Sequence, residues 1–293
     1  MRPDLFVPDF MVIGAMKSAT SSLYEQLVLQ PGIFMPELKE PNFFSDNQVF
    51  ERGYDWYEGL FAEAPEGALC GEASTHYSKL PTYPNTISRI VELPRVPRFI
   101  YVMRHPIDRL LSHYHHGWSM REIRVPLSEA LSKHPELVDY GCYAMQLTPW
   151  FEAFGRERVL PVFFDRLKQA PQKELERIGR FIGYEDTMTW HRDLAPSNVS
   201  SERVRKFAGY DLLVDSAWAT RLRRALVPKQ LRNSIRGRLT VKERPTLTES
   251  QRAQLEARFD ADLDTLGGWL GVSLDCQNFK AVTRDNTLNW VSA

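Results

Sequence analysis

Short apolar runs alternate with helix-like patterns through the first two-thirds of this 293-residue chain. The runs have the length of buried strands, which in a parallel sheet read as continuous hydrophobic stretches. After them, leucine, isoleucine and aromatic residues recur at three- and four-residue spacing, as on the buried face of a helix. The expected strands cover 10–13, 68–70, 99–103 and 159–164, and the expected helices bury Leu23, Leu27 and Val28, then Leu110, Leu111 and Tyr114, then Leu175, Ile178, Phe181 and Ile182. Strands that feed helices in this way predict an α/β fold with a central parallel β-sheet flanked by helices.

The last third of the chain has a different pattern. Positions 216–249 hold nine Lys or Arg against two Glu, a local excess of seven positive charges that we expect to form a solvated face. After this stretch, Thr248 or Ser250 can cap a closing helix at about 249–266 that ends near Gly267 and Gly268. Its apolar face consists of Leu255, Phe259, Leu263 and Leu266. Because no repeat or Gly/Ser linker divides the chain, we expect a single domain over 1–293.

Composition narrows the class of protein. The chain has 37 Lys plus Arg against 37 Asp plus Glu, whereas a dedicated nucleic-acid binder normally carries a basic excess, so no nucleic-acid partner is expected. Cys70, Cys142 and Cys276 are too few and too scattered for a disulfide scaffold or a Cys-based zinc site, which favours a reducing compartment. No run approaches the ~18 apolar residues of a membrane span. We therefore expect a cytoplasmic protein without an integral membrane segment.

The most informative segment is FMVIGAMKSATSS at 10–22, in which a strand runs into a glycine, a lysine and five small residues. Small side chains let backbone N–H groups converge on an anion at the start of a helix, and Lys17 adds a positive charge, so the segment indicates a phosphate site. It is not the nucleoside triphosphatase loop, because Met16 stands where that pattern requires glycine. Asp165, the one Asp directly after an apolar run, has nothing else to mark it as a magnesium ligand. The alternative is an ordinary strand-to-helix turn with a Ser or Thr cap.

A second segment, RFIYVMRHPIDRLLSHY at 98–114, repeats this logic. Arg104 follows an apolar strand and Pro106 suits the first turn of a helix. Arg104 and Ser112 can both point into the crevice where α/β sheets bind ligands, which suits a second phosphate. The alternative is a surface arginine and a helix serine in ordinary contacts. The segment also holds His105, His113, His115 and His116, but neighbouring helix positions diverge, so no metal site is expected.

Together these two segments resemble the PAPS-dependent sulfotransferases: KSATSS resembles the family's 5′-phosphosulfate loop and RHPIDRLLSHY its 3′-phosphate motif. KEPNFFSD at 39–46 resembles the K-E-x-x-F-F segment of the heparan-sulfate-type branch, and GEASTHY at 71–77 its next strand-end segment. The likeness covers most of the chain and is weakest in the basic stretch. It implies a single α/β domain with a nucleotide-kinase-like parallel sheet, an enzyme, PAPS as cofactor and no required metal.

The resemblance also assigns roles to individual residues. Lys17 would contact the transferring sulfonate, Arg104 and Ser112 would hold the 3′-phosphate, and Glu40 would be the general base. The loop donors to the 5′-phosphate would be Ser18, Ala19, Thr20, Ser21 and Ser22. A late loop at 198–206 would cover the cofactor, where the usual Gly-Lys pair reads Ser201-Glu202, with Arg203, Arg205 and Lys206 as candidate contacts.

The acceptor side departs from the heparan-type pattern. Asn42 stands where relatives often carry His, and Ala73 stands where they carry Lys. Lys39 is a candidate to stabilise the sulfonate or to lower the pKa of Glu40; alternatively it is only a surface partner of that residue. His76 is a candidate to contact the acceptor; alternatively it is a histidine at a strand end with its hydrogen bonds satisfied. The implied reaction is in-line sulfonate transfer to a hydroxyl, with an amine as second choice, on a small-molecule, lipid, glycan or carrier-bound acceptor. A nucleotide kinase or NTPase-like phosphotransferase and a non-catalytic nucleotide-binding protein remain the alternatives.

Overall fold

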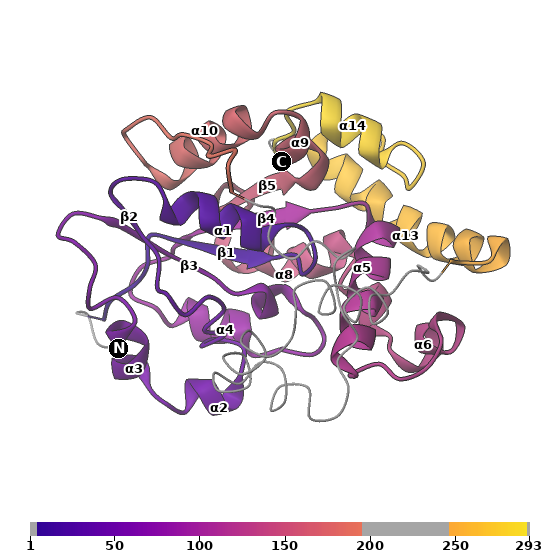
Figure 1. The fold of residues 1–293 in the computed structure, drawn as a ribbon, viewed down its shortest axis with the longest axis horizontal. Coiled ribbons are helices and arrows are strands. Elements are labelled where there is room, and N and C mark those ends of the chain that lie inside the picture. The colour runs from indigo at the N-terminus through magenta and orange to yellow at the C-terminus, as the bar shows by residue number, and fades with distance from the viewer. Residues whose placement is uncertain (1–4, 195–245, 292–293) are drawn as a thin grey trace, which may run out of the picture.

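The computed structural model describes residues 5–194 and 246–291. Five strands form one parallel sheet in the order β2-β3-β1-β4-β5 (Figure 1). The strands are β1 (Phe10–Gly14), β2 (Ile33–Phe34), β3 (Leu69–Ala73), β4 (Arg98–Met103) and β5 (Val159–Phe163). The predicted α/β fold with a central parallel sheet is confirmed. The sequence pattern missed β2, since two residues show no period, and it ended β3 too early, because Gly71 lies within the strand under the Phe10 ring.

Alternating side chains of the central strands serve two different helix layers, which is why the strands read as continuous apolar runs. Phe10 and Val12 of β1 pack toward α1 (Thr20–Val28) and α10 (Pro171–Ile182). Met11 and Ile13 pack into the larger layer on the opposite face. That layer contains α4 (Thr86–Val91), α5 (Pro106–Met120), α6 (Leu127–Lys133), α8 (Tyr143–Phe154), α13 (Glu249–Leu270) and α14 (Phe279–Asp285). The fold is therefore a three-layer sandwich whose sheet is covered on both faces.

Short elements complete the described part of the chain. They are α2 (Asn47–Phe50), α3 (Tyr54–Gly59), the 3-10 helix η1 (Thr75–Ser78), α7 (Glu136–Asp139), the 3-10 helix η2 (Arg156–Arg158) and α9 (Phe164–Gln169). The expected buried faces of the long helices are largely present, but Val28 is exposed because it ends α1. No helix among the described residues is long and apolar enough to cross a lipid bilayer.

The closing helix α13 buries its expected apolar face and begins at the expected cap. The Thr248 hydroxyl accepts a hydrogen bond from the backbone of Gln251, whose side chain bonds back to Thr248. The helix runs four residues past the predicted end, to Leu270, because Gly267 is not its stop. A Cβ at Gly267 would lie 2.5 Å from the carbonyl oxygen of Val272, so this glycine instead makes room for the returning chain. Of the basic stretch at 216–249, residues 216–245 lie outside the described part of the chain.

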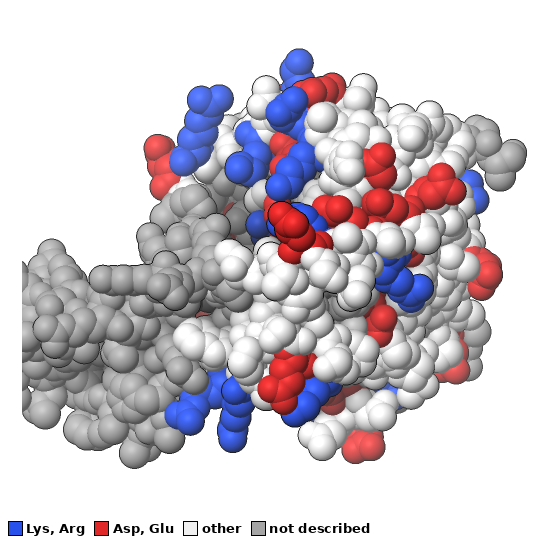
Figure 2. Space-filling view, turned by 90° about the vertical axis from the view of Figure 1, so that its right-hand side faces the viewer, with Lys and Arg blue, Asp and Glu red and all other residues white. Residues whose placement is uncertain are grey.

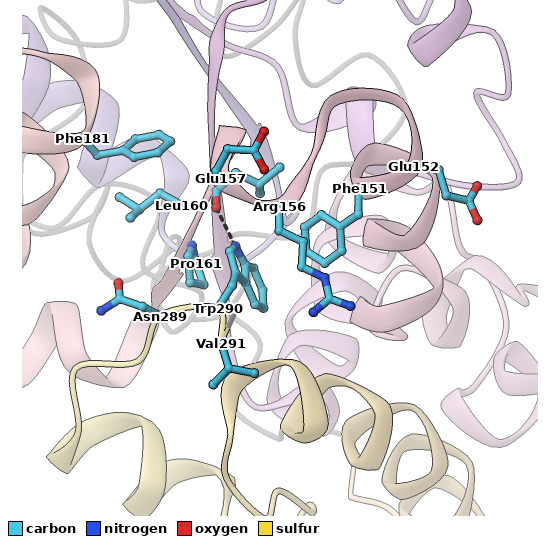
Figure 3. Close-up of a pocket in the computed structure, with 11 residues that line it drawn as sticks. Phe151, Glu152, Arg156, Glu157, Leu160, Pro161, Phe181, Asn289, Trp290 and Val291 are labelled. Carbon is cyan, nitrogen blue, oxygen red and sulfur yellow. Dashed lines mark hydrogen bonds between the residues drawn. The ribbon is translucent and has the colours of Figure 1, made fainter. Parts of the chain in front are cut away.

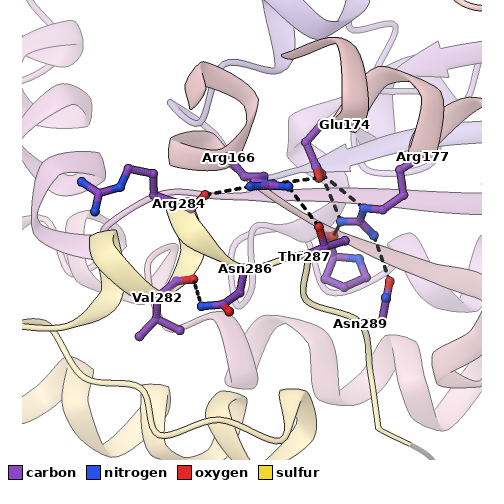
Figure 4. Close-up of polar contacts among 9 residues, drawn as sticks. Arg166, Glu174, Arg177, Val282, Arg284, Asn286, Thr287 and Asn289 are labelled. Carbon is purple, nitrogen blue, oxygen red and sulfur yellow. Dashed lines mark hydrogen bonds and ion pairs between the residues drawn. The ribbon is translucent and has the colours of Figure 1, made fainter. Parts of the chain in front are cut away.

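A polar cluster around the buried Glu174, which we call the C-terminal clamp, fixes the tail after α14 to the sheet (Figure 4). Glu174 of α10 accepts hydrogen bonds or ion pairs from Arg166 and Arg177. Arg177 also donates to Asn289, and Arg166 donates to Thr287 and to the carbonyl of Arg284 (Figure 4). The clamp consists of Arg166, Glu174, Arg177, Thr287 and Asn289.

The surface has a hollow beside β5 and a mixed distribution of charge. A hollow of about 620 Å³ opens beside the first residues of edge strand β5, where the Trp290 indole donates to the carbonyl of Val159 at 2.6 Å (Figure 3). None of the residues predicted to form the site lines this hollow. On the face shown in Figure 2, acidic and basic side chains intermix among the described residues rather than forming a field of one sign.

Strand order places the predicted site. The chain passes from β1 through β2 to β3 on one side of β1, and then crosses to β4 on the other side. Ligands of open α/β sheets bind at such a switch point, outside the carboxyl ends of the strands. The loops after β1, β3 and β4 therefore meet at one edge, and they carry Lys17, Thr75 and Arg104.

Candidate active site

The loop between β1 and α1 is built for close backbone packing. A Cβ on Gly14 would lie 2.0 Å from the Ser78 hydroxyl, so only glycine fits where β1 ends. Lys17 and Ala19 both adopt a φ of 70°, in the left-handed region, which turns the chain sharply into α1. No side-chain hydrogen bond from a described residue caps α1. Its first N–H groups are therefore available to an anion, as the sequence predicted.

The other residues of this loop line the same turn. Ser18 and Thr20 are buried, and Ser21 and Ser22 are half-buried on the first turn of α1. Small side chains at these positions keep the backbone accessible. The alternative of a turn with a Ser or Thr cap is wrong, because the residue at the cap position is Ala19.

Arg104 joins the second predicted segment to the first. Its Nη1 donates to the carbonyl of Lys17 at 3.2 Å, although the two residues are 87 positions apart. The guanidinium lies over the Phe164 ring at 4.8 Å, and the Tyr143 hydroxyl bonds the backbone of Arg104. Nε of Arg104 is buried and has no hydrogen-bond partner among the described residues. Arg104 is therefore held in place with donor capacity to spare.

Ser112 lies on α5, which begins directly after Arg104 and His105. Its side chain is buried, with 9% of the residue exposed. No hydrogen bond joins the described side chains of Ser112 and Arg104, so the structure brings them to one strand-helix unit but not into direct contact. His105 caps α5 by accepting from the backbone of Asp108, and its Nε2 lies 2.8 Å from the carbonyl oxygen of Cys276.

Glu40 lies at the carboxyl end of β3, the strand next to β1. Its backbone N–H donates to Ala73 at 3.0 Å. Its carboxylate accepts from Lys39 Nζ at 2.8 Å on one oxygen and from the Thr75 hydroxyl at 2.9 Å on the other. Burial raises the pKa of this carboxyl, but the charges of Lys39 and Lys79 and the two hydrogen bonds outweigh that effect and hold it below its ordinary value. Glu40 is thus an ionised carboxylate at neutral pH.

A buried carboxylate holds the Glu40 loop from below. Ser74 accepts from the backbone N–H of Asn42 at 3.0 Å and donates to Glu72 at 2.9 Å. Tyr57 and Tyr77 donate to the other oxygen of Glu72 at 2.8 and 2.7 Å. Because Glu72 is fully buried, its pKa rises to about 7 even though these hydroxyl groups lower it. Glu40 and Asn42 have φ of 60° and 54°, so this support holds a backbone that non-glycine residues seldom adopt.

His76 and Lys79 complete this side of the site. The His76 ring stacks on Tyr83 with centroids 4.6 Å apart, and burial together with the Lys79 charge lowers its pKa to about 4. His76 is therefore a neutral ring at neutral pH. Lys79 is only 6% exposed, and burial lowers its pKa to about 8 although Glu40 raises it.

Sequence reasoning missed Thr75, Lys79 and the support from Glu72. One signal was available for the lysine: Lys79 is the only Lys, Arg, Asp or Glu between Glu72 and Arg89. A charged residue alone in an otherwise uncharged segment after a buried strand is a candidate for the site edge. The contact from Thr75 to Glu40 spans 35 positions and has no local signature.

Three predicted cofactor contacts lie outside the described residues: Arg203, Arg205 and Lys206. The histidines after Arg104 diverge as expected, since His105 bonds Cys276 whereas His113 stacks on Tyr140. In the described ranges, no group of three or more His, Cys, Asp or Glu side chains is arranged to hold a metal ion.

Comparison with known proteins shows the family of this chain and supports its fold. The family model described as "Sulfotransferase domain" matches residues 7–267. A crystal structure of a sulfotransferase from Alicyclobacillus acidocaldarius superposes with a TM-score of 0.63 and 23% identity, covering 92% of this chain and 98% of that one. At this identity the superposition supports the fold.

Curated relatives include heparan sulfate enzymes. The chain is 29% identical over 193 residues to the mouse heparan sulfate glucosamine 3-O-sulfotransferase 3A1, covering 62% of this chain and 47% of the relative. It is 24% identical over 210 residues to the human bifunctional heparan sulfate N-deacetylase/N-sulfotransferase 1, covering 64% of this chain and 23% of the relative. The chain thus spans about half or less of the length of these relatives.

Proposed function

Because the chain belongs to the sulfotransferase domain family, we propose that it transfers a sulfonate group from PAPS to an acceptor hydroxyl with Glu40 as general base. An amine is the second choice of acceptor group. The observation that carries this proposal is the hydrogen bond from Arg104 to the Lys17 loop, which unites two anion-binding segments one strand away from Glu40. A double phosphate site beside an ionised carboxylate suits a donor with phosphates at two positions.

The residues present fit this donor. Lys17 and the uncapped start of α1, with Ser18, Ala19, Thr20, Ser21 and Ser22, would hold the 5′-phosphosulfate. Arg104, which has a buried Nε to spare, and Ser112 would hold the 3′-phosphate. When bound, PAPS supplies an activated sulfonate and leaves as PAP. The contributions of Arg203, Arg205 and Lys206 remain predictions.

The chain's own side chains account for the two charge changes of such a transfer. As the acceptor oxygen bonds to sulfur, its proton passes to the carboxylate of Glu40, which is already ionised at neutral pH. Lys17 and the backbone donors of the loop would stabilise the negative charge that develops on the departing PAP. By analogy with phosphoryl transfer, positioned groups of this kind supply most of the catalysis. Lys39 holds Glu40 in place and can face the sulfonate.

The acceptor class is narrowed in part. The named relatives act on heparan sulfate, which favours a glycan among the acceptors considered. Small-molecule, lipid and carrier-bound acceptors are less favoured by these names. Asn42 and Ala73 still separate this chain from the usual heparan-type pattern. His76 is a candidate to contact the acceptor as a neutral ring. A cytoplasmic location also remains a prediction.

The first test is calorimetric titration with PAP in EDTA, using the wild type and Arg104→Ala. We expect micromolar binding that depends on the 3′-phosphate, so that AMP and ADP bind more weakly, and that weakens at least tenfold in the variant. Arg180→Ala, an exposed arginine on α10, is the matched control and should bind as the wild type does. Equal binding of ADP, or binding that requires magnesium, would contradict the proposal and favour a nucleotide kinase. Binding without turnover on any acceptor would favour a non-catalytic nucleotide-binding protein.

A further inference from the structure

Lys79 is a nearly buried cation with no carboxylate at ion-pair distance among the described residues. Only 6% of the residue is exposed, and its Nζ lies 5.8 Å from the centre of the Tyr140 ring. A buried ammonium without an anionic partner is costly, and buried charges in proteins are normally paired. A contact with the face of one ring stabilises a lysine less than an ion pair at hydrogen-bond distance would. Lys79 therefore has capacity for a ligand.

The backbone around Lys79 is fixed on both sides. The Ser78 hydroxyl donates to the carbonyl of Ile13 in β1 at 2.7 Å. The fully buried amide of Gln146 bonds both the N–H and the carbonyl of Leu80, at 2.8 and 2.9 Å. Lys79 thus projects from a rigid segment rather than from a flexible surface loop, which is the condition for a preorganised binding group.

Lys79 lies close enough to Glu40 for the two charges to interact. Thr75, four residues earlier in the same segment, donates to Glu40, and the charges of Lys79 and Glu40 act on each other. His76 stacks on Tyr83, and His113 stacks on Tyr140 with centroids 5.7 Å apart.

The two histidines add neutral polar atoms and no charge. Nδ1 of both His76 and His113 is buried without a hydrogen-bond partner among the described residues. Burial is the main cause that lowers their pKa, to about 4 and about 2, with help from neighbouring cations, including Lys79 in both cases. Arg109, also close enough to lower the pKa of His113, is fully buried and has two nitrogens without a partner in the described part of the chain. Lys39, Lys79 and Arg109 are thus the cations that act on this cluster, and Glu122 and Asp46 act on Lys79 and His76 without forming an ion pair with Lys79.

We propose that Lys79 binds an anionic group of the acceptor, a carboxylate or a sulfate, while the acceptor hydroxyl faces Glu40. This inference rests on the proposed function, and it names the chemical class of its acceptor. An acid would give Lys79 the ion-pair partner that no described carboxylate supplies, whereas a protonated amine would be repelled by Lys79 and Lys39. The family pattern has a lysine at the position of Ala73. Lys79 would supply a cation on the same side of the site from a different position.

The test uses the PAP-saturated 293-residue chain and matched pairs of acidic and neutral probes. The pairs are glucuronate with glucose, glucose 6-sulfate with glucose, and 4-hydroxybenzoate with 4-hydroxybenzyl alcohol. We expect the wild type to bind at least one acidic probe tenfold or more tightly than its neutral partner by calorimetry or saturation-transfer NMR. Lys79→Met should abolish that preference and leave binding of the neutral partner unchanged, and Lys79→Arg should restore part of it. If no acidic probe is preferred, or if Lys79→Met keeps the preference, the proposal is wrong.

Controls separate this inference from a structural role and from the proposed function. Lys133→Met removes an exposed lysine on α6 and should change nothing in probe binding. PAP affinity and melting temperature should be unchanged in Lys79→Met; if both fall together with the preference, Lys79 is structural and the inference fails. If PAP does not bind to the wild type at all, the proposed function fails, and the preference for acidic probes is then measured without PAP.

Discussion

In the C-terminal clamp, Glu174 lies between Arg166 and Arg177 with 2% of its side chain exposed, whereas Glu40 has one lysine in direct contact and keeps 29% of its side chain exposed. Each arginine of the clamp also reaches further acceptors on the tail or the sheet (Figure 4). Around Glu40, buried groups such as Lys79 and the Nδ1 atom of His76 retain binding capacity.

The backbone repeats this contrast. Four of the five described non-glycine residues with positive φ are in the site loops: Lys17, Ala19, Glu40 and Asn42. Such conformations cost on the order of 1–3 kcal/mol each and persist where the surroundings hold them. The clamp shows none of these strained positions. The charged groups of the clamp are thus paired with one another, although Arg166 Nε lies 3.6 Å from Glu174 without a hydrogen bond, whereas Lys79 near Glu40 has no ion-pair partner among the described residues.

Glu40→Gln is expected to have the largest effect on the site side. The amide keeps the shape and the Thr75 contact but cannot accept a proton, so kcat should fall about 10²–10⁴-fold, the usual contribution of a general base. PAP affinity and melting temperature should stay near the wild-type values, because Glu40 lies outside the phosphate loops. Initial rates with PAPS and any accepted hydroxyl compound, alongside PAP titration, measure both. A variant that keeps full activity would remove Glu40 as the base.

Glu174→Ala should have the largest effect on the clamp side. Removing this carboxylate leaves Arg166 and Arg177 without their shared anion, and breaking a buried pair in this way costs about 3–5 kcal/mol. Urea unfolding measures the loss, and PAP affinity of the folded variant should be retained. Glu129→Ala, which breaks an exposed pair with Lys133, is the control and should change the free energy of unfolding by less than about 1 kcal/mol. If both variants lose the same free energy of unfolding, the clamp contributes no more to stability than an exposed ion pair, and the prediction is wrong.

Sequence reasoning recovered the parts of this molecule that depend on local pattern. Continuous apolar runs predicted four of the five strands, and the glycine and small residues after β1 predicted the tight turn into α1. It missed β2, which is too short to show a period, and the end of α13, where Gly267 serves packing rather than termination.

Contacts between distant segments could not be predicted in the same way. The bond from Arg104 to Lys17 links segments 87 positions apart, and that from Thr75 to Glu40 spans 35. The resemblance to a family suggested that Lys17, Arg104 and Glu40 share a site, but it carried no information on Lys79, which departs from the pattern. The clamp was invisible because charged residues in amphipathic helices usually face solvent.

Glu72→Gln tests a third carboxylate beside Glu40 and Glu174. Glu72 accepts hydrogen bonds from hydroxyl groups, whereas Glu174 is paired with arginines. Burial is the main cause that raises the pKa of Glu72 to about 7 from an ordinary value of 4.5. Between these values the folded protein keeps a proton that the unfolded chain has released, so this contribution to stability is complete below about pH 4.5 and is lost as the pH rises through 7. At 1.36 kcal/mol per pH unit, the difference between 4.5 and 7 corresponds to a loss of about 3 kcal/mol. In Glu72→Gln, urea unfolding at pH 5 and pH 8 should differ by less than in the wild type; an unchanged difference would contradict this account.

Ser112→Ala should give the smallest effect and tests whether a single hydroxyl of the site acts on binding or on folding. If Ser112 donates to the 3′-phosphate, its loss should weaken PAP binding by the worth of one hydrogen bond to a charged group, about 1.5–3 kcal/mol or roughly 10–150-fold, and leave AMP binding unchanged. Ser119 is the matched control, since it is also buried on α5 but donates to the carbonyl of His116 within the helix. Ser119→Ala should lower the free energy of unfolding by about 1 kcal/mol without changing PAP affinity. If Ser112→Ala lowers the free energy of unfolding but leaves PAP affinity unchanged, Ser112 has a structural role, like the polar groups of the clamp, and does not bind the donor.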